Sequence, residues 1–367
     1  MNIQVGFISY GLDRSPGGIG RYMKEMLAIL PHKEVEVTTL HAGRTQSHNG
    51  TVSLPGAKLL PGLLTIGQIE IGLVVKQQNL DIIHDSTGCI PLMFAGTKRV
   101  ATIYDVIPYI YPETSSKLDW LIYRFWLPKV VHHIDAVFTI SQQSKQDIMK
   151  YLKVKPEKIF NMSCAANSTY QPMTRIQINP ILRKHGINFP YILYVGSIEA
   201  RKNLKRLLES FALLLKQLPQ AQLVIVGAKK WKFTPIFETV QRLNLESHLH
   251  FTGYIPDEDL PAIYNGADVF VFPSLYEGFG LPVLEAMACG TPVITSNISS
   301  LPEVAGKAAL YVFPKNIQEI TDAMYRLLTD SALADDLRTR GLTQAKKFSW
   351  EKTAQETIAV YKQICSL

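Results

Sequence analysis

Short apolar runs alternate with longer amphipathic stretches along most of the chain. In the first half, the runs that have the character of buried strands cover residues 3–9, 35–40, 81–84, 99–103 and 136–140. In the second half, similar runs cover residues 191–196, 222–227, 248–253 and 267–273. Because helical stretches separate these runs, the pattern predicts an α/β fold, with parallel sheets that carry helices on both faces.

The alternation fades between about residues 163 and 190, where the chain is polar and rich in turn-forming residues. We therefore place a linker there and expect two Rossmann-like domains in tandem, at residues 1–172 and 185–348. Each is long enough to form its own core. A last helix is expected within residues 349–367, with Ser349 as its N-cap.

The most informative segment, residues 267–297, reads ADVFVFPSLYEGFGLPVLEAMACGTPVITSN. It predicts a strand, a loop, a helix and a second strand, with two carboxylates, Glu277 and Glu285, eight residues apart. Gly278 and Gly280 allow the backbone to approach a ligand closely, and the helix N-terminus favours an anion. A nucleotide sugar suits this order, with its sugar at Glu277, its diphosphate at the glycine amides and its ribose at Glu285. The alternative is that Glu277 caps the helix and Glu285 is merely solvated.

This segment resembles the E-x7-E signature of the retaining GT-B glycosyltransferases of glycosyltransferase family 4, and the resemblance covers nearly the whole chain. It implies a GT-B architecture, in which two Rossmann-like domains face a central cleft and a C-terminal helix crosses back to the first domain. It also implies front-face attack, in which the leaving diphosphate draws the acceptor proton. The loop residues that the resemblance assigns to the donor are Gly278, Phe279, Gly280 and Leu281.

A second donor-side segment, VGSIEARKN at residues 195–203, follows a strand and opens a helix. Gly196 permits close backbone approach, while Arg201 and Lys202 are cations at a helix start, where the helix dipole disfavours them. A bound phosphate would relieve that misfit, and the resemblance assigns both side chains to the donor diphosphate. Three further residues lie in loops that resemble those holding the nucleoside: Gly227, Gly253 and Tyr254.

The triplet Asp257-Glu258-Asp259 spells D-x-D, the metal motif of the other glycosyltransferase fold, GT-A. It directly precedes a helical stretch, so we interpret Asp257 as an N-cap and the acidic turn as a complement to the helix dipole. We therefore expect no metal and no cofactor. Arg201 and Lys202 must then neutralise the diphosphate by themselves.

The first half is expected to bind the acceptor. Gly18 lies in a glycine-rich loop that resembles the family's N-terminal loop near the donor phosphate. The stretch ATIYDVIP resembles the family's T-I-H-D-L-I-P, with Asp105 retained as a catalytic candidate and Tyr104 in place of the usual histidine. Tyrosine can still donate a hydrogen bond, although it does not titrate near neutral pH. Two other candidate sugar or acceptor contacts stand at strand ends, His84 and Ser141, and for His84 a partly buried structural histidine is the alternative.

The positive charge of the chain is concentrated in its first half. Residues 1–180 carry 18 Lys+Arg and 13 Asp+Glu, so 18 − 13 = 5 of the total net charge of +7. This excess predicts an anionic partner, either a membrane surface or an acidic acceptor, with ordinary solvation as the alternative. Residues 118–131, LDWLIYRFWLPKVV, combine aromatic and basic side chains and suit either a membrane interface or a packing helix. No nucleic-acid module is recognisable, and the four scattered cysteines suit a reducing cytoplasm.

These features predict a cytoplasmic, metal-independent, retaining glycosyltransferase, peripheral on the inner face of the cell membrane if its basic half binds lipid. The segments YVGSIEARKN and TIYDVIP most resemble those of the mannosyltransferase-type members of the family. That resemblance implies GDP-mannose as the first donor, with a UDP-sugar as the second. The acceptor is a glycan or lipid-linked glycan in cell-surface polysaccharide biosynthesis. One alternative is a sugar-nucleotide isomerase of the 2-epimerase type on the same fold, which would need several carboxylates and histidines in both halves. Another is a non-catalytic nucleotide-sugar-binding subunit, which would not need Glu277, Glu285, Arg201 and Lys202 together.

Overall fold

The computed structural model describes residues 2–10, 17–32, 34–42, 51–54, 64–88, 90, 97–227 and 234–366. Most of the predicted glycine-rich loop, residues 11–16, lies outside these ranges. The chain divides into two compact units. Unit 1 contains Met1–Cys164 and Ser349–Leu367, and unit 2 contains Ala165–Phe348.

Unit 1 is built on a parallel sheet of seven strands in the order β3-β2-β1-β4-β5-β6-β7. The strands are β1 (Ile3–Tyr10), β2 (Val35–Ala42), β3 (Thr51–Ser53), β4 (Ile82–Asp85), β5 (Lys98–Thr102), β6 (Ala136–Thr139) and β7 (Ile159–Asn161). The short edge strands β3 and β7 have too few residues to show a period, and the hydrophobic pattern did not predict them.

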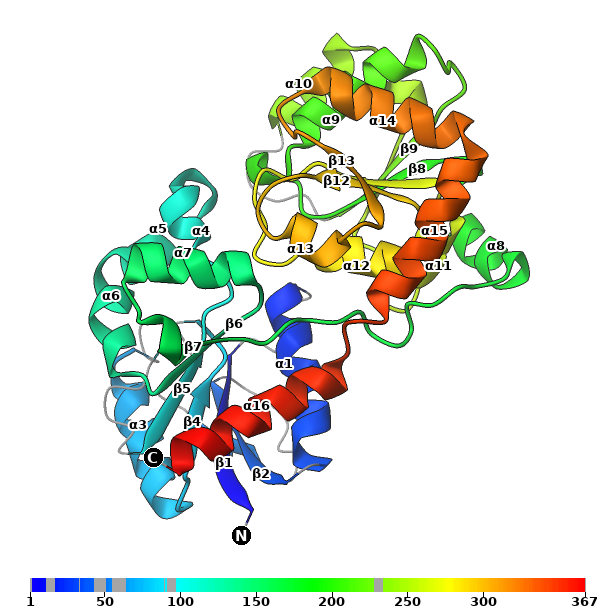
Figure 1. Cartoon of the computed structure of the whole chain (residues 1–367). Coiled ribbons are helices and arrows are strands. Elements are labelled where there is room, and N and C mark those ends of the chain that lie inside the picture. The colour runs from blue at the N-terminus through cyan, green and yellow to red at the C-terminus, as the bar shows by residue number, and fades with distance from the viewer. Residues whose placement is uncertain are drawn as a thin grey trace. The chain divides into compact units, whose positions relative to one another are not determined.

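Helices cover both faces of this sheet (Figure 1). The face with α1 (Gly18–Ile29) also carries the C-terminal helix α16 (Trp350–Cys365). The other face carries α3 (Ile66–Gln77), α6 (Leu127–Val130) and α7 (Gln142–Leu152), whose apolar side chains share one buried core. The remaining helical segments of unit 1 are α4 (Ile107–Ile110), α5 (Lys117–Leu121), a π-helical turn (Ile122–Trp126) and short 3-10 turns that include Val131–His133.

Helix α16 is fixed to the sheet of unit 1 by a hydrogen-bonded histidine in the interior. The Nδ1 atom of His84 lies 2.6 Å from the hydroxyl of Tyr361, and its Nε2 atom lies 2.8 Å from the hydroxyl of Thr102. Burial lowers the pKa of His84 to about 3, so the ring is neutral at physiological pH. His84 therefore joins two strands to the last helix of the chain.

Unit 2 is built on a parallel sheet of six strands in the order β10-β9-β8-β11-β12-β13. The strands are β8 (Ile192–Val195), β9 (Leu223–Val226), β10 (Leu249–Gly253), β11 (Val269–Phe272), β12 (Val293–Ser296) and β13 (Ala309–Val312). The helices are α8 (Arg175–Lys184), α9 (Leu204–Leu215), α10 (Thr234–Arg242), α11 (Leu260–Gly266), α12 (Leu281–Ala288), α13 (Leu301–Ala305), α14 (Ile317–Thr329) and α15 (Ser331–Ala345). The predicted α/β class with parallel sheets is confirmed.

Two local predictions are wrong. The polar stretch interpreted as a linker contains α8, whose capping box pairs Thr174 with Gln177. The first unit ends at Cys164, within that stretch, and not at residue 172. Asp257 is not the N-cap of α11, because that helix begins after Asp259. The carboxylate of Asp259 makes no cap either and instead accepts from Lys184, the last residue of α8, at 2.7 Å and from the following His185 at 2.8 Å.

The pairing of His84 with α16 generates a stability prediction. Substituting Tyr361→Phe removes the hydroxyl and leaves Nδ1 of the buried His84 ring without its partner. An unsatisfied buried group costs about 1–3 kcal/mol, so we expect a lower midpoint in urea denaturation. Tyr325→Phe is the control, since Tyr325 is 38% exposed on α14. Equal midpoints for the two variants would show that the His84 contact does not hold α16.

Candidate active site

The candidate site lies in unit 2, in the loops that follow the carboxyl ends of adjacent strands. The N–H of Gly196, after β8, donates to Val226, and the N–H of Gly227, after β9, donates to Gly253 at 2.9 Å. A side chain at Gly227 would bring its Cβ to 2.0 Å from the carbonyl oxygen of Gly196. Only glycine fits this point. Through these hydrogen bonds the loops after β8, β9 and β10 meet at one edge of the sheet, where open α/β sheets bind ligands.

A buried carboxylate between two cations lies at this edge. Glu277, in the loop after β11, is 7% exposed. Its Oε1 atom lies 2.7 Å from Nζ of Lys202, and its Oε2 atom lies 3.0 Å from Nη1 of Arg201. The Lys202 ammonium also lies 5.0 Å from the centre of the Phe272 ring, within cation–π range. The structure thus joins the predicted sugar ligand and the predicted diphosphate ligands in one cluster.

Glu277 remains ionised in this cluster. Burial by itself would raise its pKa, but the charges of Lys202 and Arg201, with hydrogen bonds from Lys202 and Ser274, lower the pKa to about 2. The Ser274 hydroxyl donates to Oε1 at 2.6 Å. Ser299 and Ser300 bind the backbone of Glu277, so both ends of the residue are fixed. The position and the ionised state of the carboxylate are therefore fixed by its neighbours.

Arg201 is held by more than Glu277. Its Nη2 atom donates to Glu199 at 3.0 Å, and its Nη1 atom also donates to the backbone of Tyr276. With Glu199 and Glu277 ionised, the cluster of two acids and two bases has no net charge. A dianionic diphosphate placed here would share Lys202 and Arg201 with Glu277, and it would need the glycine amides as further donors.

Asn203 fixes the turn that carries both cations. It adopts a left-handed backbone with φ of 62°, and its side-chain amide donates to the carbonyls of Pro273 and Pro314, which follow β11 and β13. The N–H of Leu275 donates to the Arg201 carbonyl at 2.9 Å. Sequence reasoning did not assign a site role to Asn203, Glu199 or Ser274. The first two lie inside the VGSIEARKN segment, and that position could have identified them as neighbours of Arg201 and Lys202.

The loop between the two predicted carboxylates leads into α12. Gly280, with φ of 119°, occupies the N-cap, and Leu281 is the first helical residue. Phe279 is buried and packs edge-on against Phe348. Glu285 is 2% exposed, and its Oε2 atom accepts from the Tyr264 hydroxyl at 2.9 Å. Glu285 is therefore part of a buried hydrogen bond with α11, which excludes the interpretation of a merely solvated carboxylate.

Tyr254 is the exposed member of the predicted donor set. It follows β10 and is 57% exposed. The preceding Gly253 has φ of 73°, and no atom of the described residues lies within 4 Å of the position that its Cβ would take. The loop after β10 thus exposes an aromatic ring, and its contact with a nucleoside stays a prediction.

The polar candidates of unit 1 have structural partners. The Tyr104 hydroxyl donates its proton to the Ser86 carbonyl at 2.8 Å, and the Ser141 hydroxyl accepts from the Ser144 N–H as the N-cap of α7. Both residues are buried, as is His84. These three predicted sugar or acceptor contacts therefore have internal partners in unit 1, and their contact with a ligand stays a prediction.

Asp105 and Gly18 lie at the edge of the unit 1 sheet where the carboxyl ends of the strands meet. Asp105 follows β5 and is half-buried, and its Oδ1 atom accepts from the Ile107 N–H at 2.9 Å. Gly18 is the first residue of α1. In the part of the chain that the structure describes, no three His, Cys, Asp or Glu side chains are grouped as a metal site would need.

Comparison with known proteins identifies the class of enzyme. The family described as Glycosyl transferases group 1 matches residues 178–344, and the family described as Glycosyltransferase Family 4 matches residues 16–164. The chain belongs to these GT4-type glycosyltransferases and is an enzyme of that class. The sequence-based prediction of the family is confirmed, and the isomerase and the non-catalytic subunit are excluded with it.

Two curated relatives come from Escherichia coli. The O-antigen chain mannosyltransferase B is 36% identical over 72% of this chain and 70% of its own length. The serotype-specific mannosyltransferase WbdA is 34% identical over 73% of this chain, which spans only about a third (34%) of that relative's length.

Solved structures show the same fold. A sucrose-phosphate synthase from Thermosynechococcus elongatus superposes with a TM-score of 0.82 at 23% identity, over 100% of both chains. HepE from Anabaena, in complex with UDP-glucose, superposes with a TM-score of 0.79 at 17% identity, over 100% of both chains. The GT-B fold predicted from the sequence is confirmed.

The ionised state of Glu277 generates a pH prediction. Its pKa is lowered from 4.5 to about 2 in the folded protein. The resulting stabilisation, roughly 3 kcal/mol, is complete above the unfolded pKa and disappears as the pH falls towards the folded pKa. Glu277→Gln should therefore be less stable than wild type at pH 7, and the difference should shrink between about pH 5 and 2. Urea denaturation at several pH values measures it, and a difference that does not change with pH contradicts the assignment.

Proposed function

We propose that the enzyme transfers a mannosyl unit from GDP-mannose to a growing cell-surface glycan on a lipid carrier, with retention of configuration and without a metal ion. The observation that carries the proposal is the ionised, buried carboxylate of Glu277, held between Lys202 and Arg201 among the glycine loops of unit 2. Mannose is favoured by the relative named an O-antigen chain mannosyltransferase. A UDP-sugar is the second donor, since HepE carries UDP-glucose on the same fold.

The proposed donor position follows the order of the loops. The diphosphate contacts Lys202 and Arg201 and the backbone amides before α12, where the helix N-terminus also favours an anion. The sugar hydroxyls donate to Glu277, the ribose hydroxyls donate to Glu285, and the base lies against the loop with Tyr254. Each of these contacts is part of the proposal, and the burial and charge of the side chains support it.

The pKa of Glu277 favours a particular chemical course. A carboxylate with a pKa near 2 is a weak base, so Glu277 orients the sugar and does not remove the acceptor proton. In the proposed reaction the acceptor oxygen bonds to the anomeric carbon as the bond from that carbon to the diphosphate breaks. The acceptor proton passes to the departing phosphate oxygen on the same face of the sugar, which retains the configuration. Lys202 and Arg201 stabilise the negative charge that builds on the diphosphate.

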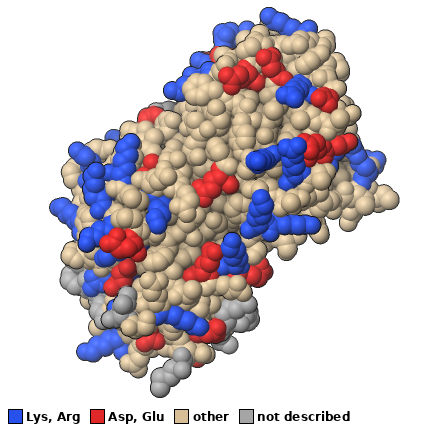
Figure 2. Space-filling model, viewed as in Figure 1, with Lys and Arg blue, Asp and Glu red and all other residues tan. Residues whose placement is uncertain are grey.

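We propose that the reaction takes place in the cytoplasm, with unit 1 at an anionic membrane surface that carries the lipid-linked acceptor. No helix that the structure describes is long and apolar enough to cross a membrane. Lysines and arginines gather on the face of unit 1 formed by α5, α6 and α7 (Figure 2). The exposed basic residues on and beside these elements are Lys117, Arg124, Lys129, Lys150, Lys153 and Lys155.

A thermal-shift screen over GDP, UDP, ADP and their mannose and glucose derivatives tests the donor. A ligand at 100 times its Kd adds about 2.7 kcal/mol of stability, so GDP and GDP-mannose should raise the melting temperature more than the other nucleotides do. Transfer of mannose to an acceptor glycan, with NMR of the product anomer, tests the reaction itself. Preferential stabilisation by UDP would reject the proposed donor, and stabilisation by no nucleotide would reject the site.

Two matched variants locate the ribose contact in the same screen. Glu285→Gln keeps an oxygen for Tyr264 but removes the charge, whereas Tyr264→Phe keeps the charge and removes the internal hydrogen bond. If Glu285 binds the ribose, the Gln variant loses about 1.5–3 kcal/mol of donor affinity and the Phe variant loses little. The opposite order would assign Glu285 to the packing of α11 alone.

Lys202 should matter for turnover more than for donor binding, because the charge on the diphosphate increases as the bond breaks. Lys202→Ala should lower turnover about 10²–10³-fold, by analogy with the loss of one oxyanion donor. Lys205→Ala is the control, since Lys205 is exposed on the neighbouring helix α9. EDTA should leave the wild-type rate unchanged. Loss of activity in EDTA that Mn²⁺ restores would show that a metal neutralises the diphosphate instead.

A further inference from the structure

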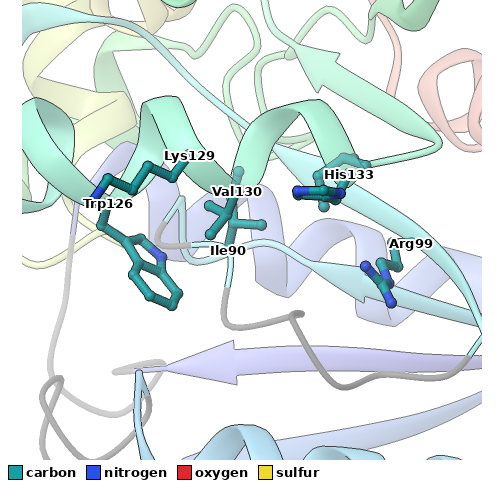
Figure 3. A pocket seen from close by; sticks show the side chains of 7 residues that line it. Ile90, Arg99, Trp126, Lys129, Val130 and His133 are labelled. Carbon is teal, nitrogen blue, oxygen red and sulfur yellow. The ribbon is translucent and has the colours of Figure 1, made fainter.

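Unit 1 contains a groove of about 350 Å³ that the proposed sugar transfer does not use. One wall is a single helical face, in which Trp126, Lys129, Val130 and His133 follow one another at spacings of three, one and three residues. Arg99, at the start of β5, lies across from them (Figure 3). The remaining lining residues are Ile90 and Ile134. The volume lies within the range of small-molecule sites, roughly 300–1,000 Å³.

The chemistry of the groove is amphipathic. Its apolar middle is formed by Val130, Ile134 and Ile90, all of which are buried. Arg99 and His133 stand at one end, and Lys129 lies beside Trp126 at the other (Figure 3). None of the described lining residues is acidic.

A carboxylate does lie in the adjoining hollow, which Asp135 shares with Arg99 and His133. Its Oδ2 atom accepts from the backbone N–H of Arg99 at 2.8 Å, so this hydrogen bond does not use the Arg99 guanidinium. The groove therefore offers an apolar floor with cationic side chains at its rim.

The same chain segment continues into an exposed apolar surface. Trp120 is 40% exposed and Phe125 is 55% exposed, and their rings meet edge to face with centroids 5.8 Å apart. Leu118 and Leu121, on the same short helix as Trp120, are also exposed. The π-helical turn widens the backbone between this surface and the groove, so that Phe125 is exposed while the next residue, Trp126, lines the groove. The exposed apolar side chains and one wall of the groove thus belong to consecutive turns of the same chain segment.

We propose that this groove binds one anionic lipid of the membrane, with its phosphate at Arg99 and His133 and its hydrocarbon chain against Val130 and Trp126. Free phosphate would leave the apolar floor unused, and a neutral lipid would leave the cations unpaired. The exposed rings of Trp120 and Phe125 enter the interface beside the bound lipid, where aromatic residues are favoured. This inference rests on the membrane attachment proposed above and is independent of the transfer reaction.

The end of the groove that holds Arg99 lies away from the predicted acceptor position. Arg99 is the second residue of β5, whereas Tyr104 and Asp105 follow the carboxyl end of that strand. The bound lipid is therefore an anchor that orients unit 1 on the membrane and is not the acceptor that receives the sugar. A lipid that acts only as an anchor can be removed without abolishing transfer to a water-soluble acceptor.

Cosedimentation with phosphatidylglycerol vesicles tests the groove, with the double variant Arg99→Gln/Lys129→Gln. Each cation near an anionic surface contributes to the binding free energy, and the loss of two should weaken vesicle binding about 30-fold. The control is Lys24→Gln/Lys76→Gln, which removes the same charge from exposed positions in unit 1 outside the groove and outside the face formed by α5, α6 and α7. We expect the control to bind nearly as well as wild type. Equal weakening of both variants would show that only overall charge matters, and the groove proposal would fail.

Lipids with brominated acyl chains test the apolar floor, because bromine quenches a nearby tryptophan. We expect the brominated lipids to quench the fluorescence of the Trp126→Phe variant less than that of the Trp120→Phe variant. Three results would each overturn the proposal: equal binding to phosphatidylcholine vesicles, release of the protein by inorganic phosphate at constant ionic strength, or a dimer in solution that covers the groove. Turnover on a water-soluble acceptor is measured in parallel. If the wild-type protein binds the vesicles but transfers no sugar to the water-soluble acceptor, the proposed reaction is rejected and the lipid-groove proposal is not.

Discussion

A buried carboxylate that stays ionised is the constraint on which the geometry of unit 2 depends. An unpaired charge at the depth of Glu277 would be strongly unfavourable, so the fold has to bring Lys202 and Arg201 to it from the turn after β8. That turn is possible because Asn203 adopts a left-handed backbone and binds the carbonyls of Pro273 and Pro314. Removing one member of such a cluster leaves the others unpaired, at a cost of about 3–5 kcal/mol. Binding geometry and folding stability are therefore coupled in the same few residues.

The sequence was sufficient to predict the fold class, the family and the charged residues of the donor side. Glu277, Arg201 and Lys202 could be recognised because each belongs to a short segment with glycines and strand ends at fixed positions. Their mutual contact could not be derived, since it joins residues 75 positions apart. Ser274 gave no signal at all, because a serine after a strand is ordinary until its hydroxyl is seen to point at a carboxylate.

The acceptor side shows the limit of pattern reasoning. His84, Tyr104 and Ser141 stand at strand ends, where polar residues often bind ligands, yet all three are buried with internal partners. Residue type and strand position do not reveal whether a side chain faces the interior, because that depends on which helix covers it. For His84 the covering helix is α16, at the far end of the chain. The helix α8 was missed for a similar reason, as its polar sequence is stabilised by its capping box and by contacts with α11.

The return of α16 to unit 1 has a consequence for the order in which the protein can fold. Tyr361 lies 277 positions after its partner His84 and stacks on Phe138, so the last helix completes a core that the first residues began. On the ribosome, every residue of unit 2 emerges before α16 does. Unit 2 can therefore close its core first, while the sheet face of unit 1 that α16 will share with α1 remains partly uncovered. During that interval the nascent chain exposes an apolar surface of the kind that chaperones bind. The N-terminal half of the polypeptide is then the later half to complete its folding.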